Sequence, residues 1–470
     1  MFSDFCRVIL LATAFFVFHG GSEVRAAEKW SGEFWLTNPD QTALFQKQAQ
    51  GLVFETNKFS GPVIEVDDTH KYQTMDGFGY ALTGGSAMLL HQLDSDRRAA
   101  ILQELFSTSG TNIGVSYLRV SIGASDLDDH VFSYDDLPEG QTDPEMTRFS
   151  VDIETNHLIP VLRQILEINP EIKILGSPWS PPVWLKTNGK TKGGSLKPEF
   201  YEAYAKYFVK YIQGMKRAGI RIDAITVQNE PLHPGNNPSM LMQAAEQCVF
   251  IKTHLGPAFK RAGIDTKIIL YDHNADRPDY PISILNDPEA KPFVDGSAFH
   301  LYKGKIKALT KVHKAHPDKN LYFTEQWVGA PGNFAGDFGH HMNLLIIGAP
   351  RNWCRNVLEW NLAADPYLRP HTEGGCTQCL GALTIGDDIK RNPSYYIIAH
   401  AAKFVRPGSV RVASNTLKQL SNVAYQTPDG RTVLIVFNNS QTDQNFAIRF
   451  HGRNARMVLR SGAAGTFVWE

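Results

Sequence analysis

The chain has 470 residues, of which 43% are hydrophobic and 20% are charged, and its formal net charge is −1. This is the composition of an ordinary globular protein, long enough to bury one large core and a smaller accessory unit. Because the charges balance, nothing in the composition favours nucleic acid or an anionic membrane surface as a partner, and a neutral substrate fits better than a polyanion.

The amino end predicts an export signal over residues 1–26. Arg7 precedes an apolar run from Val8 to Phe18, and small residues follow up to Ala26. The run is shorter than the roughly 20 residues that a membrane-spanning helix needs, and it fits the core of a signal peptide. Two charged residues in unusual positions leave a retained anchor as the alternative. We expect an exported protein, periplasmic, at the cell surface or secreted, without stable membrane insertion after cleavage.

From residue 71 to residue 402, strand-like runs alternate with amphipathic helical patterns. The longest helical pattern has Pro198 in its first turn and Gly219 just past its end, and its aromatic stripe favours core packing over a binding surface. Eight strands that alternate with helices predict an α/β fold, a (β/α)8 TIM barrel, rather than an open doubly wound sheet. The eight runs cover residues 75–83, 115–123, 172–180, 223–231, 266–274, 295–303, 321–329 and 355–363.

The first run contains the nearest approach to a nucleotide-binding loop, GFGYALTGG. It lacks both the glycine spacing and the acidic partner of a dinucleotide fingerprint. No such cofactor is therefore expected.

The two ends of the chain differ in character from the middle. Residues 403–470 predict short strands, with a Pro-Asp-Gly turn between two β runs in SNVAYQTPDGRTVLIVFNNS, and GPVIEVDD within residues 27–70 is also strand-like. A lone patch of four strands is marginally stable. We therefore expect the N-terminal and C-terminal segments to pair in an accessory β-sandwich beside the barrel.

The cysteines give no clear metal motif. Cys376-x-x-Cys379 is compatible with a small bridge or half of a zinc site, but a second closely spaced Cys or His pair is missing. His340 and His341 are adjacent, and no His-Glu-x-x-His is present. Free or locally bridged thiols are favoured over a metal for the four cysteines that follow the predicted cleavage site, Cys248, Cys354, Cys376 and Cys379.

Two glutamates end the fourth and seventh runs, Glu230 in DAITVQNEP and Glu325 in LYFTEQW. The carboxyl ends of barrel strands share one face, where the active sites of barrel enzymes lie. Glycoside hydrolysis needs two carboxyl groups, one to protonate the leaving oxygen and one to attack the sugar carbon or activate water. A separation of about 5–5.5 Å is typical of retention, and about 6.5–9.5 Å of inversion. The alternative is a pair of ordinary ion-paired glutamates.

The motifs resemble those of glycoside hydrolase family 30, which includes glucosylceramidases and microbial β-1,6-glucanases. The resemblance implies a retaining double displacement without cofactor or metal, with Glu230 as the general acid/base and Glu325 as the nucleophile. The matching stretches run in family order over nearly the whole mature chain: GFGYALT, YLRVSIGASD, SPWSPPVWLKTNG, GSLKPEFYEAYAKYFVKYI, VQNEP, FHLY, FTEQW and EWNLA.

The resemblance also implies the surroundings of the two glutamates. Asn229 would bind the sugar 2-hydroxyl, and Arg119 would hold Glu325 ionised through charge-assisted hydrogen bonds. Structural roles are the alternatives, a turn for Asn229 and a salt bridge in the barrel floor for Arg119. The other implied substrate-binding residues are Asp126, Trp179, His300, Tyr302, Trp327 and Trp360.

Several of these residues also have a structural interpretation. Helix capping is the alternative for Asp126, and core packing is the alternative for Trp179 and Trp360. His300 is also compatible with a satisfied buried histidine that makes no direct contact with a sugar.

The loops favour a carbohydrate polymer over a lipid. The loop after Glu230, LHPGNNPSM, is short and polar, and Trp327 stands where the glucosylceramidase side of the family has a smaller residue. These features resemble the bacterial β-1,6-glucanase branch. We predict an endo-β-1,6-glucanase acting on a β-glucan or β-glucoside. Glucosylceramidase or exo-β-glucosidase activity is the nearest alternative, followed by a xylan-cleaving enzyme and a non-catalytic carbohydrate-binding barrel.

Overall fold

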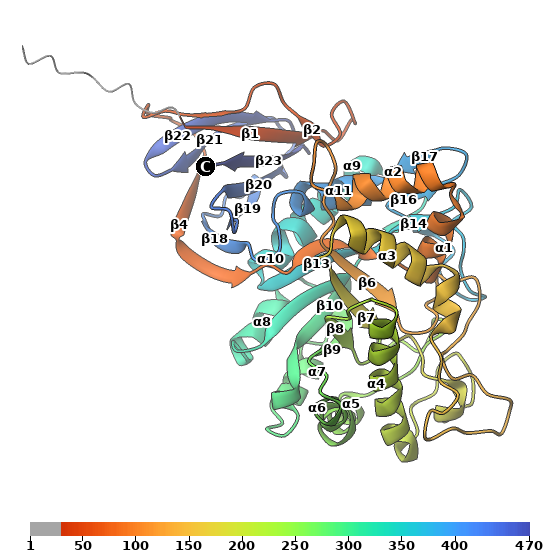
Figure 1. Ribbon diagram of the computed structural model, residues 1–470. Helices are drawn as coiled ribbons and strands as arrows, with labels where there is room; N and C mark the ends of the chain where they lie inside the picture. Colours follow the sequence, from red (N-terminus) through yellow and green to blue (C-terminus); the bar gives the residue numbers. More distant parts are fainter. Residues whose placement is uncertain (1–29) are drawn as a thin grey trace, which may run out of the picture.

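The computed structural model describes residues 30–470, which form a barrel and a sandwich of strands beside it (Figure 1). The predicted export signal, residues 1–26, lies outside the described residues. None of the helices in the described part combines the length and the apolar character that a bilayer crossing requires.

Eight parallel strands, one from each predicted run, close the barrel in the described chain. Each strand pairs with the next in chain order, and the last pairs with the first, so all carboxyl ends lie on one face. The predicted (β/α)8 barrel is confirmed. Its strands are β5 (Gly77–Ala81), β6 (Tyr117–Ser121), β7 (Lys173–Ser177), β8 (Ala224–Thr226), β9 (Lys267–Ala275), β10 (Val294–Gly304), β11 (Asn320–Glu325) and β13 (Cys354–Asn361).

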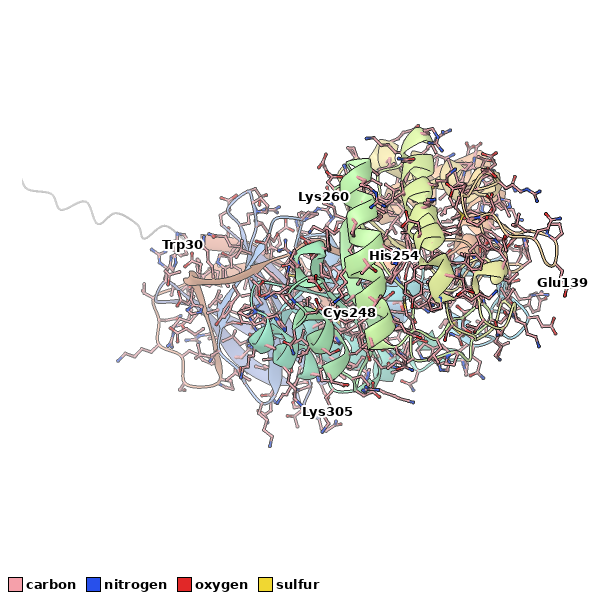
Figure 2. The ribbon with its side chains drawn as sticks, turned by 90° about the horizontal axis from the view of Figure 1, so that it is seen from below. Trp30, Glu139, Cys248, His254, Lys260 and Lys305 are labelled. Atoms are coloured by element: carbon pink, nitrogen blue, oxygen red, sulfur yellow. A yellow bond between two sulfur atoms is a disulfide. The ribbon has the colours of Figure 1, made fainter. Side chains whose placement is uncertain are left out.

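Helices connect these strands and cover the outside of the barrel. The predicted long helix is α4 (Tyr201–Arg217), and Gly219 behind it has a φ of +84°, a conformation that glycine adopts without strain. Figure 2 shows α4 beside the continuous helical segment from residue 244 to residue 262. The aromatic side chains of α4 are buried, as core packing requires: Tyr204, Tyr207, Phe208 and Tyr211.

The remaining helical elements follow in chain order. The α-helices are α1 (Gly84–Gln92), α2 (Ser95–Phe106), α3 (Leu158–Ile168), α5 (Ala244–Phe250), α6 (Gly256–Ala262), α7 (Asp279–Leu285), α8 (Ala308–Ala315), α9 (Phe334–His341), α10 (Gly348–Arg351) and α11 (Pro393–Ala402). The short 3-10 and π turns are η1 (Asp152–Asn156), η2 (Val183–Leu185), η3 (Pro198–Phe200), η4 (Ile251–Leu255), η5 (Lys291–Phe293) and η6 (Met342–Ile347).

Two layers of side chains occupy the barrel interior. An apolar layer comes from seven of the strands: Tyr117, Leu175, Ala224, Ile269, Ala298, Tyr322 and Leu358. Alternate residues of a strand face the same side, so the next inward position lies two residues further along each strand. At six strands this second position is taken by Arg119, Ser177, Thr226, His300, Thr324 and Trp360. The apolar layer thus lies at the bottom, and a second layer, polar except for Trp360, lies on it towards the carboxyl face.

The two ends of the chain build the accessory β-sandwich, shown by the red and blue strands of Figure 1. β1 pairs with β23, and β4 pairs with both β18 and β21, so each end supplies strands that the other lacks. The predicted pairing of the two ends is confirmed. The strands are β1 (Trp30–Thr37), β2 (Gln46–Lys47), β3 (Leu52–Phe54), β4 (Val63–Thr74), β18 (Val410–Ser414), β19 (Leu420–Gln426), β20 (Thr432–Asn438), β21 (Gln444–Phe450), β22 (Arg453–Leu459) and β23 (Ala464–Trp469).

Short strands also form in the loops that follow β11 and β13. β12 (Val328–Gly329) pairs with β15 (Cys379–Leu380), directly behind the segment that carries Glu325. A second small sheet is made of β14 (Ala363–Ala364), β16 (Leu383–Ile385) and β17 (Ile389–Arg391).

One buried histidine joins the sandwich to the barrel. His400 lies in α11, its Nε2 is 2.8 Å from Oγ1 of Thr37 in β1, and its Nδ1 is 2.9 Å from Oγ1 of Thr466 in β23. Among residues 30–470 no carboxylate contacts the ring, and burial lowers the pKa of His400 from 6.5 to about 3. The imidazole is therefore neutral in the folded protein at neutral pH.

This burial predicts a loss of stability in acid. Below pH 6.5 His400 becomes protonated in the unfolded chain, whereas in the folded chain it becomes protonated only near pH 3. Stability is thus fully present above pH 6.5 and falls with decreasing pH by about 1.4 kcal/mol per pH unit from this group. We expect His400→Gln to remove that slope, measured as the urea unfolding free energy of both proteins between pH 4 and 8. Parallel pH profiles would contradict the assignment.

Candidate active site

A cavity of about 330 Å³ lies at the carboxyl face of the barrel. It collects eight of the ten site residues predicted from the sequence: Asp126, Trp179, Asn229, Glu230, Tyr302, Glu325, Trp327 and Trp360. The other two, Arg119 and His300, are completely buried beneath it. His300 therefore does not line the cavity and contacts the two glutamates from below. His233, Asn236, Cys376 and Cys379 complete the lining.

The two glutamates reach this cavity from different backbone settings. Glu325 is the last residue of β11, whereas Glu230 lies four residues beyond β8 with a φ of +44°. The Glu230 N–H donates to the carbonyl of Asp272 at 3.0 Å, which fixes this otherwise unfavourable conformation. One oxygen of each carboxylate and a ring nitrogen of His300 all lie within 4.8 Å of one another.

Two donors hold the Glu325 carboxylate. Nη1 of Arg119 donates to its Oε2 at 2.6 Å, and the Tyr302 hydroxyl donates to its Oε1 at 2.9 Å. A guanidinium at this distance forms a charge-assisted hydrogen bond, which is stronger than a neutral one. Arg119 also donates to Oδ1 of Asn229 at 2.7 Å, so one side chain positions both a carboxylate and the neighbouring amide.

Glu230 faces imidazoles. Nδ1 of His300 lies 3.2 Å from its Oε1, and Nε2 of His273 lies 3.7 Å from the same oxygen. On the other side of the His300 ring, Nε2 is 3.1 Å from Oδ1 of Asp272. Burial opposes a charge on His300, but Glu325, Asp272 and Glu230 together outweigh it and raise the pKa of His300 to about 9. His300 is therefore an imidazolium at neutral pH and bridges two carboxylates.

The charges act differently on the two glutamates. Burial raises the pKa of Glu230, but the hydrogen bond and charge of His300, with His273, outweigh it and leave the pKa lowered. Burial and the Glu230 charge raise the pKa of Glu325 against His300 and Arg119. These directions are the reverse of those that the expected roles require. The contacts favour charge on Glu325 nonetheless, because it accepts from a guanidinium and a phenol, whereas the imidazole beside Glu230 can return its proton.

The sequence analysis missed Asp272, the centre of the buried network. Its Oδ2 accepts hydrogen bonds from Arg119 at 2.8 Å, and from the hydroxyls of Ser177 and Thr226 at 2.7 Å each. Thr324 donates to its Oδ1 at 2.6 Å. Burial opposes the charge, but Arg119 and His300 overcome it and hold the pKa of Asp272 well below its usual range. Asp272 thus remains ionised and fixes both cations beneath the cavity.

A β-bulge turns Asp272 inwards. Ala298 of β10 pairs with Tyr271, and the next residue, Phe299, pairs with His273, so Asp272 is skipped. Tyr271 and Asp272 have φ values of +70° and +63°. Without the bulge, the alternation from Ile269 would point Tyr271 into the barrel. A bulge re-aims a side chain in this way next to many active sites. The signal in the sequence was a polar stretch at the end of the fifth run.

The cavity floor is aromatic. The ring centroids of Trp179 and Trp360 are 5.5 Å apart, and the Arg119 guanidinium lies 4.7 Å from the first ring and 5.7 Å from the second. Asp126 stands at the rim of this floor, where burial and the charges of Glu325 and Glu230 raise its pKa to about 7. Flat apolar faces beside directed polar groups are what a sugar ring requires.

A second cavity of about 390 Å³ lies on the other side of Glu230. The two cavities share Glu230, His233 and Tyr302 in their linings. The second one is otherwise lined by Leu232, Tyr271, His273, Asn274, Asp276, Arg277 and Lys303. Glu230 therefore stands between two spaces, one that it shares with Glu325 and one that Glu325 does not reach.

A metal does not fit the carboxylate pair. Among residues 30–470, the group whose ligand atoms could converge on an ion is Glu230, His300 and Glu325. His300 is an imidazolium at neutral pH, and Glu325 already pairs with Arg119. A bound cation would have to displace or repel two existing positive charges.

Comparisons with known proteins agree with this fold. The model described as the glycosyl hydrolase family 30 TIM-barrel domain matches residues 75–405, and the family's beta sandwich domain matches residues 408–467. An endo-1,6-beta-D-glucanase from Neurospora crassa is 36% identical over 366 residues, 74% of either chain. The lysosomal acid glucosylceramidase of Mus musculus is 30% identical over 84% of this chain and 80% of its own. A solved structure of an endo-beta1,6-glucanase superposes with a TM-score of 0.88 at 34% identity, over 93% of this chain and 99% of that one.

Proposed function

Because this chain belongs to glycosyl hydrolase family 30, we propose that it is an endo-acting enzyme that cleaves internal β-1,6 bonds of a glucan. The reaction is a double displacement that retains the anomeric configuration. The chain is a glycoside hydrolase, and its substrates are glycans. The observation that carries the retaining mechanism is the closeness of Glu230 and Glu325, since one carboxylate oxygen of each lies within 4.8 Å of the other. Retaining enzymes hold the two groups about 5–5.5 Å apart, whereas inverting enzymes leave room for a water between them.

In the first step Glu325 attacks the anomeric carbon, and Glu230 protonates the departing oxygen. A glycosyl–Glu325 ester forms and the glycosidic bond breaks. In the second step Glu230 removes a proton from water, and the resulting hydroxide displaces Glu325. Arg119 and Tyr302 stabilise Glu325 as the leaving carboxylate, because both donate to it. Asn229, held by Arg119, would bind the sugar 2-hydroxyl beside the acid.

His300 supplies Glu230 with the proton that general acid catalysis requires. Its imidazolium touches Glu230 on one side and Asp272 on the other, at 3.2 Å and 3.1 Å. When a sugar excludes water from the cavity, the free energy of the ionised pair of Glu230 carboxylate and His300 imidazolium rises. A proton can then pass from Nδ1 of His300 to Glu230. The Glu230–His300 pair therefore holds the proton that the leaving oxygen receives.

The second cavity supports a sugar as the leaving group. It lies beyond Glu230 and carries side chains that can hydrogen-bond hydroxyls, among them His233, Asn274 and Lys303. The ceramide of a glucosylceramide would leave these polar groups unpaired at a cost. A glucan continues past the cleaved bond with hydroxylated rings and can satisfy them.

Export completes the proposal, since a polymeric glucan outside the cell cannot cross the membrane to reach an enzyme inside. Residues 1–26 would direct the chain out of the cytoplasm, as the charged and apolar pattern of that segment indicates.

Assay of the purified protein on pustulan, a β-1,6-glucan, tests the function beside laminarin and glucosylceramide. We expect oligosaccharides from pustulan early in the reaction, little product from laminarin, and no glucose from glucosylceramide. NMR of the first product should show the β anomer. No sugar released from pustulan would overturn the substrate, and an initial α anomer would overturn the mechanism.

A further inference from the structure

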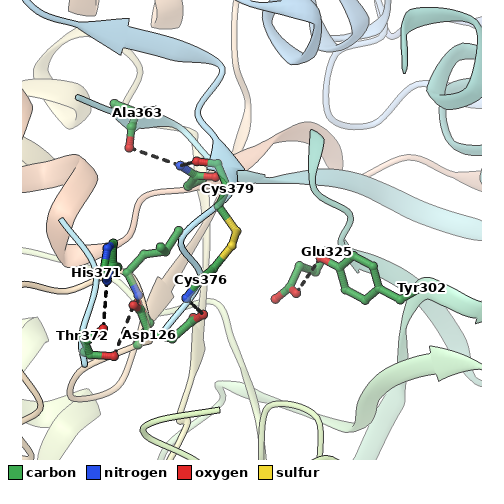
Figure 3. The surroundings of a disulfide bond; sticks show 11 residues. Asp126, Tyr302, Glu325, Ala363, His371, Thr372, Cys376 and Cys379 are labelled. Carbon is green, nitrogen blue, oxygen red and sulfur yellow. Dashed lines mark hydrogen bonds between the residues drawn. A yellow bond between two sulfur atoms is a disulfide. The ribbon is translucent and has the colours of Figure 1, made fainter. Parts of the chain in front are cut away.

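The Cys376–Cys379 disulfide forms part of the wall of the catalytic cavity. Cys379 packs in one cluster with Trp179 and Trp360, and Cys376 packs against the same cluster together with Trp327. Figure 3 shows the bridge close to the Asp126 carboxylate, with Glu325 and Tyr302 across the cavity. The bridge closes a turn of four residues that lies against the proposed sugar.

This turn is attached to the Asp126 loop on one side. The Cys376 N–H donates to Oδ2 of Asp126 at 3.2 Å, and the Thr372 N–H donates to the Asp126 carbonyl at 3.0 Å. Gly375 packs so tightly on that carbonyl that a Cβ would lie 2.3 Å from it. Among the described residues other than Asp126 itself, only Cys376 donates a hydrogen bond to the Asp126 carboxylate.

On the other side, the turn is attached to the segment behind Glu325. Cys379 in β15 pairs with Gly329 in β12, and the Ala330 N–H donates to the carbonyl of Gln378 at 2.8 Å. Trp327 precedes β12 directly and lines the cavity. The turn that the disulfide closes lies in the loop after β13, and it thus contacts the loops that follow two other barrel strands, β6 and β11.

We propose that the Cys376–Cys379 disulfide is a positioning element for the bound sugar, which acts by fixing Asp126 against the outer hydroxyls. The inference rests on the proposed function, because it assumes a sugar in this cavity. Without the bridge, the turn keeps its chain connections but loses the cross-link that sets the direction of the Cys376 N–H. The Asp126 carboxylate then rotates away from the sugar, and the affinity for the sugar falls.

A double-mutant cycle tests this mechanism. We expect Cys376→Ala/Cys379→Ala to lower kcat/KM on an aryl β-glucoside and on pustulan by about 10-fold to 100-fold, as for the loss of a hydrogen bond to a charged group. Most of the effect should appear in KM. Asp126→Ala should cause at least as large a loss. If the bridge acts through Asp126, adding the two cysteine substitutions to Asp126→Ala changes kcat/KM by less than twofold.

Cys248→Ala is the matched control, because Cys248 lies on α5 at the outside of the barrel (Figure 2) and should leave the kinetics unchanged. Binding of a glucose-configured iminosugar, measured by calorimetry, reports the same site without turnover. If the wild type neither binds it nor hydrolyses any β-glucoside, the proposed function fails. If the wild type does both and the disulfide variant equals it, or if the losses multiply in the triple variant, the inference is wrong.

Reduction offers the same comparison without substitution, and it replaces the variant should that fail to fold. A phosphine breaks the S–S bond by giving up two electrons and taking oxygen from water, and the two sulfurs receive the two protons. Wild-type protein purified in phosphine, with both thiols confirmed by labelling, should show the same rise in KM. Reoxidation should restore the original value. Reduced protein with an unchanged KM would overturn the proposal.

Discussion

Glu325→Gln is expected to reduce turnover of β-1,6-glucan by roughly 10⁴-fold or more, as the loss of a catalytic nucleophile does in other enzymes. The amide is a poor nucleophile and cannot form the glycosyl ester. The fold should survive, because Arg119 keeps its ion pair with Asp272 at 2.8 Å and its hydrogen bond to Asn229. Initial rates on pustulan measure the first effect, and circular dichroism with thermal unfolding measures the second.

Glu359→Gln provides the matched control for this substitution. Glu359 is also a buried glutamate on a barrel strand, β13, but it pairs with His341 outside the cavity. Its variant should keep the turnover of the wild type even if its stability falls. Normal hydrolysis by Glu325→Gln, or equal losses in both variants, would end the assignment of Glu325 as the nucleophile.

Glu230→Gln is expected to give a loss that depends on the leaving group. Cleavage of pustulan should fall by about 10²-fold to 10⁴-fold, because an alkoxide must now leave without a proton. Glycosylation by 2,4-dinitrophenyl β-glucoside should change far less, since that phenolate leaves unaided. The glycosyl–Glu325 ester should then accumulate, because the base that activates water is also missing. A burst of phenolate in stopped-flow measurements checks this expectation.

Azide sharpens the test of Glu230. As an anion it needs no general base, so it should restore turnover of the dinitrophenyl substrate by Glu230→Gln and yield the β-glucosyl azide. An α-azide would show a single displacement and contradict the retaining mechanism. Equal losses on pustulan and on the activated glucoside would show that Glu230 does not act as the acid. The wild type, in which Glu230 repels the anion, serves as the control.

The sequence predicted those features that depend on short-range patterns. The eight runs became the eight barrel strands, because alternating β-branched and aromatic residues between helical patterns favour parallel strands with crossovers. Glu230 and Glu325 met at one face because all strands of such a barrel point the same way. Eight of the ten predicted site residues line one cavity for the same reason.

The predictions that depended on pairing between distant segments were more limited. The inward-facing positions of a regular strand follow from its two-residue periodicity, so the side chains of Arg119 and His300 can be assigned to the barrel interior. The distance of these side chains from the cavity cannot be predicted in this way. His300 proved to be buried below the cavity, in contact with Asp272. For the Cys376-x-x-Cys379 motif the sequence favoured free or locally bridged thiols over a metal, and the structure contains the bridge.

By itself, then, the sequence determined the barrel, the sandwich built from its two ends, and the two carboxyl groups at the strand ends. Only the tertiary structure decided which side chains stand behind them. Asp272 points inwards because β9 bulges where it meets β10, and such a bulge arises from the register of two strands rather than from the residues of one. The disulfide lines the cavity for a similar reason, because its turn is held by loops that follow other barrel strands.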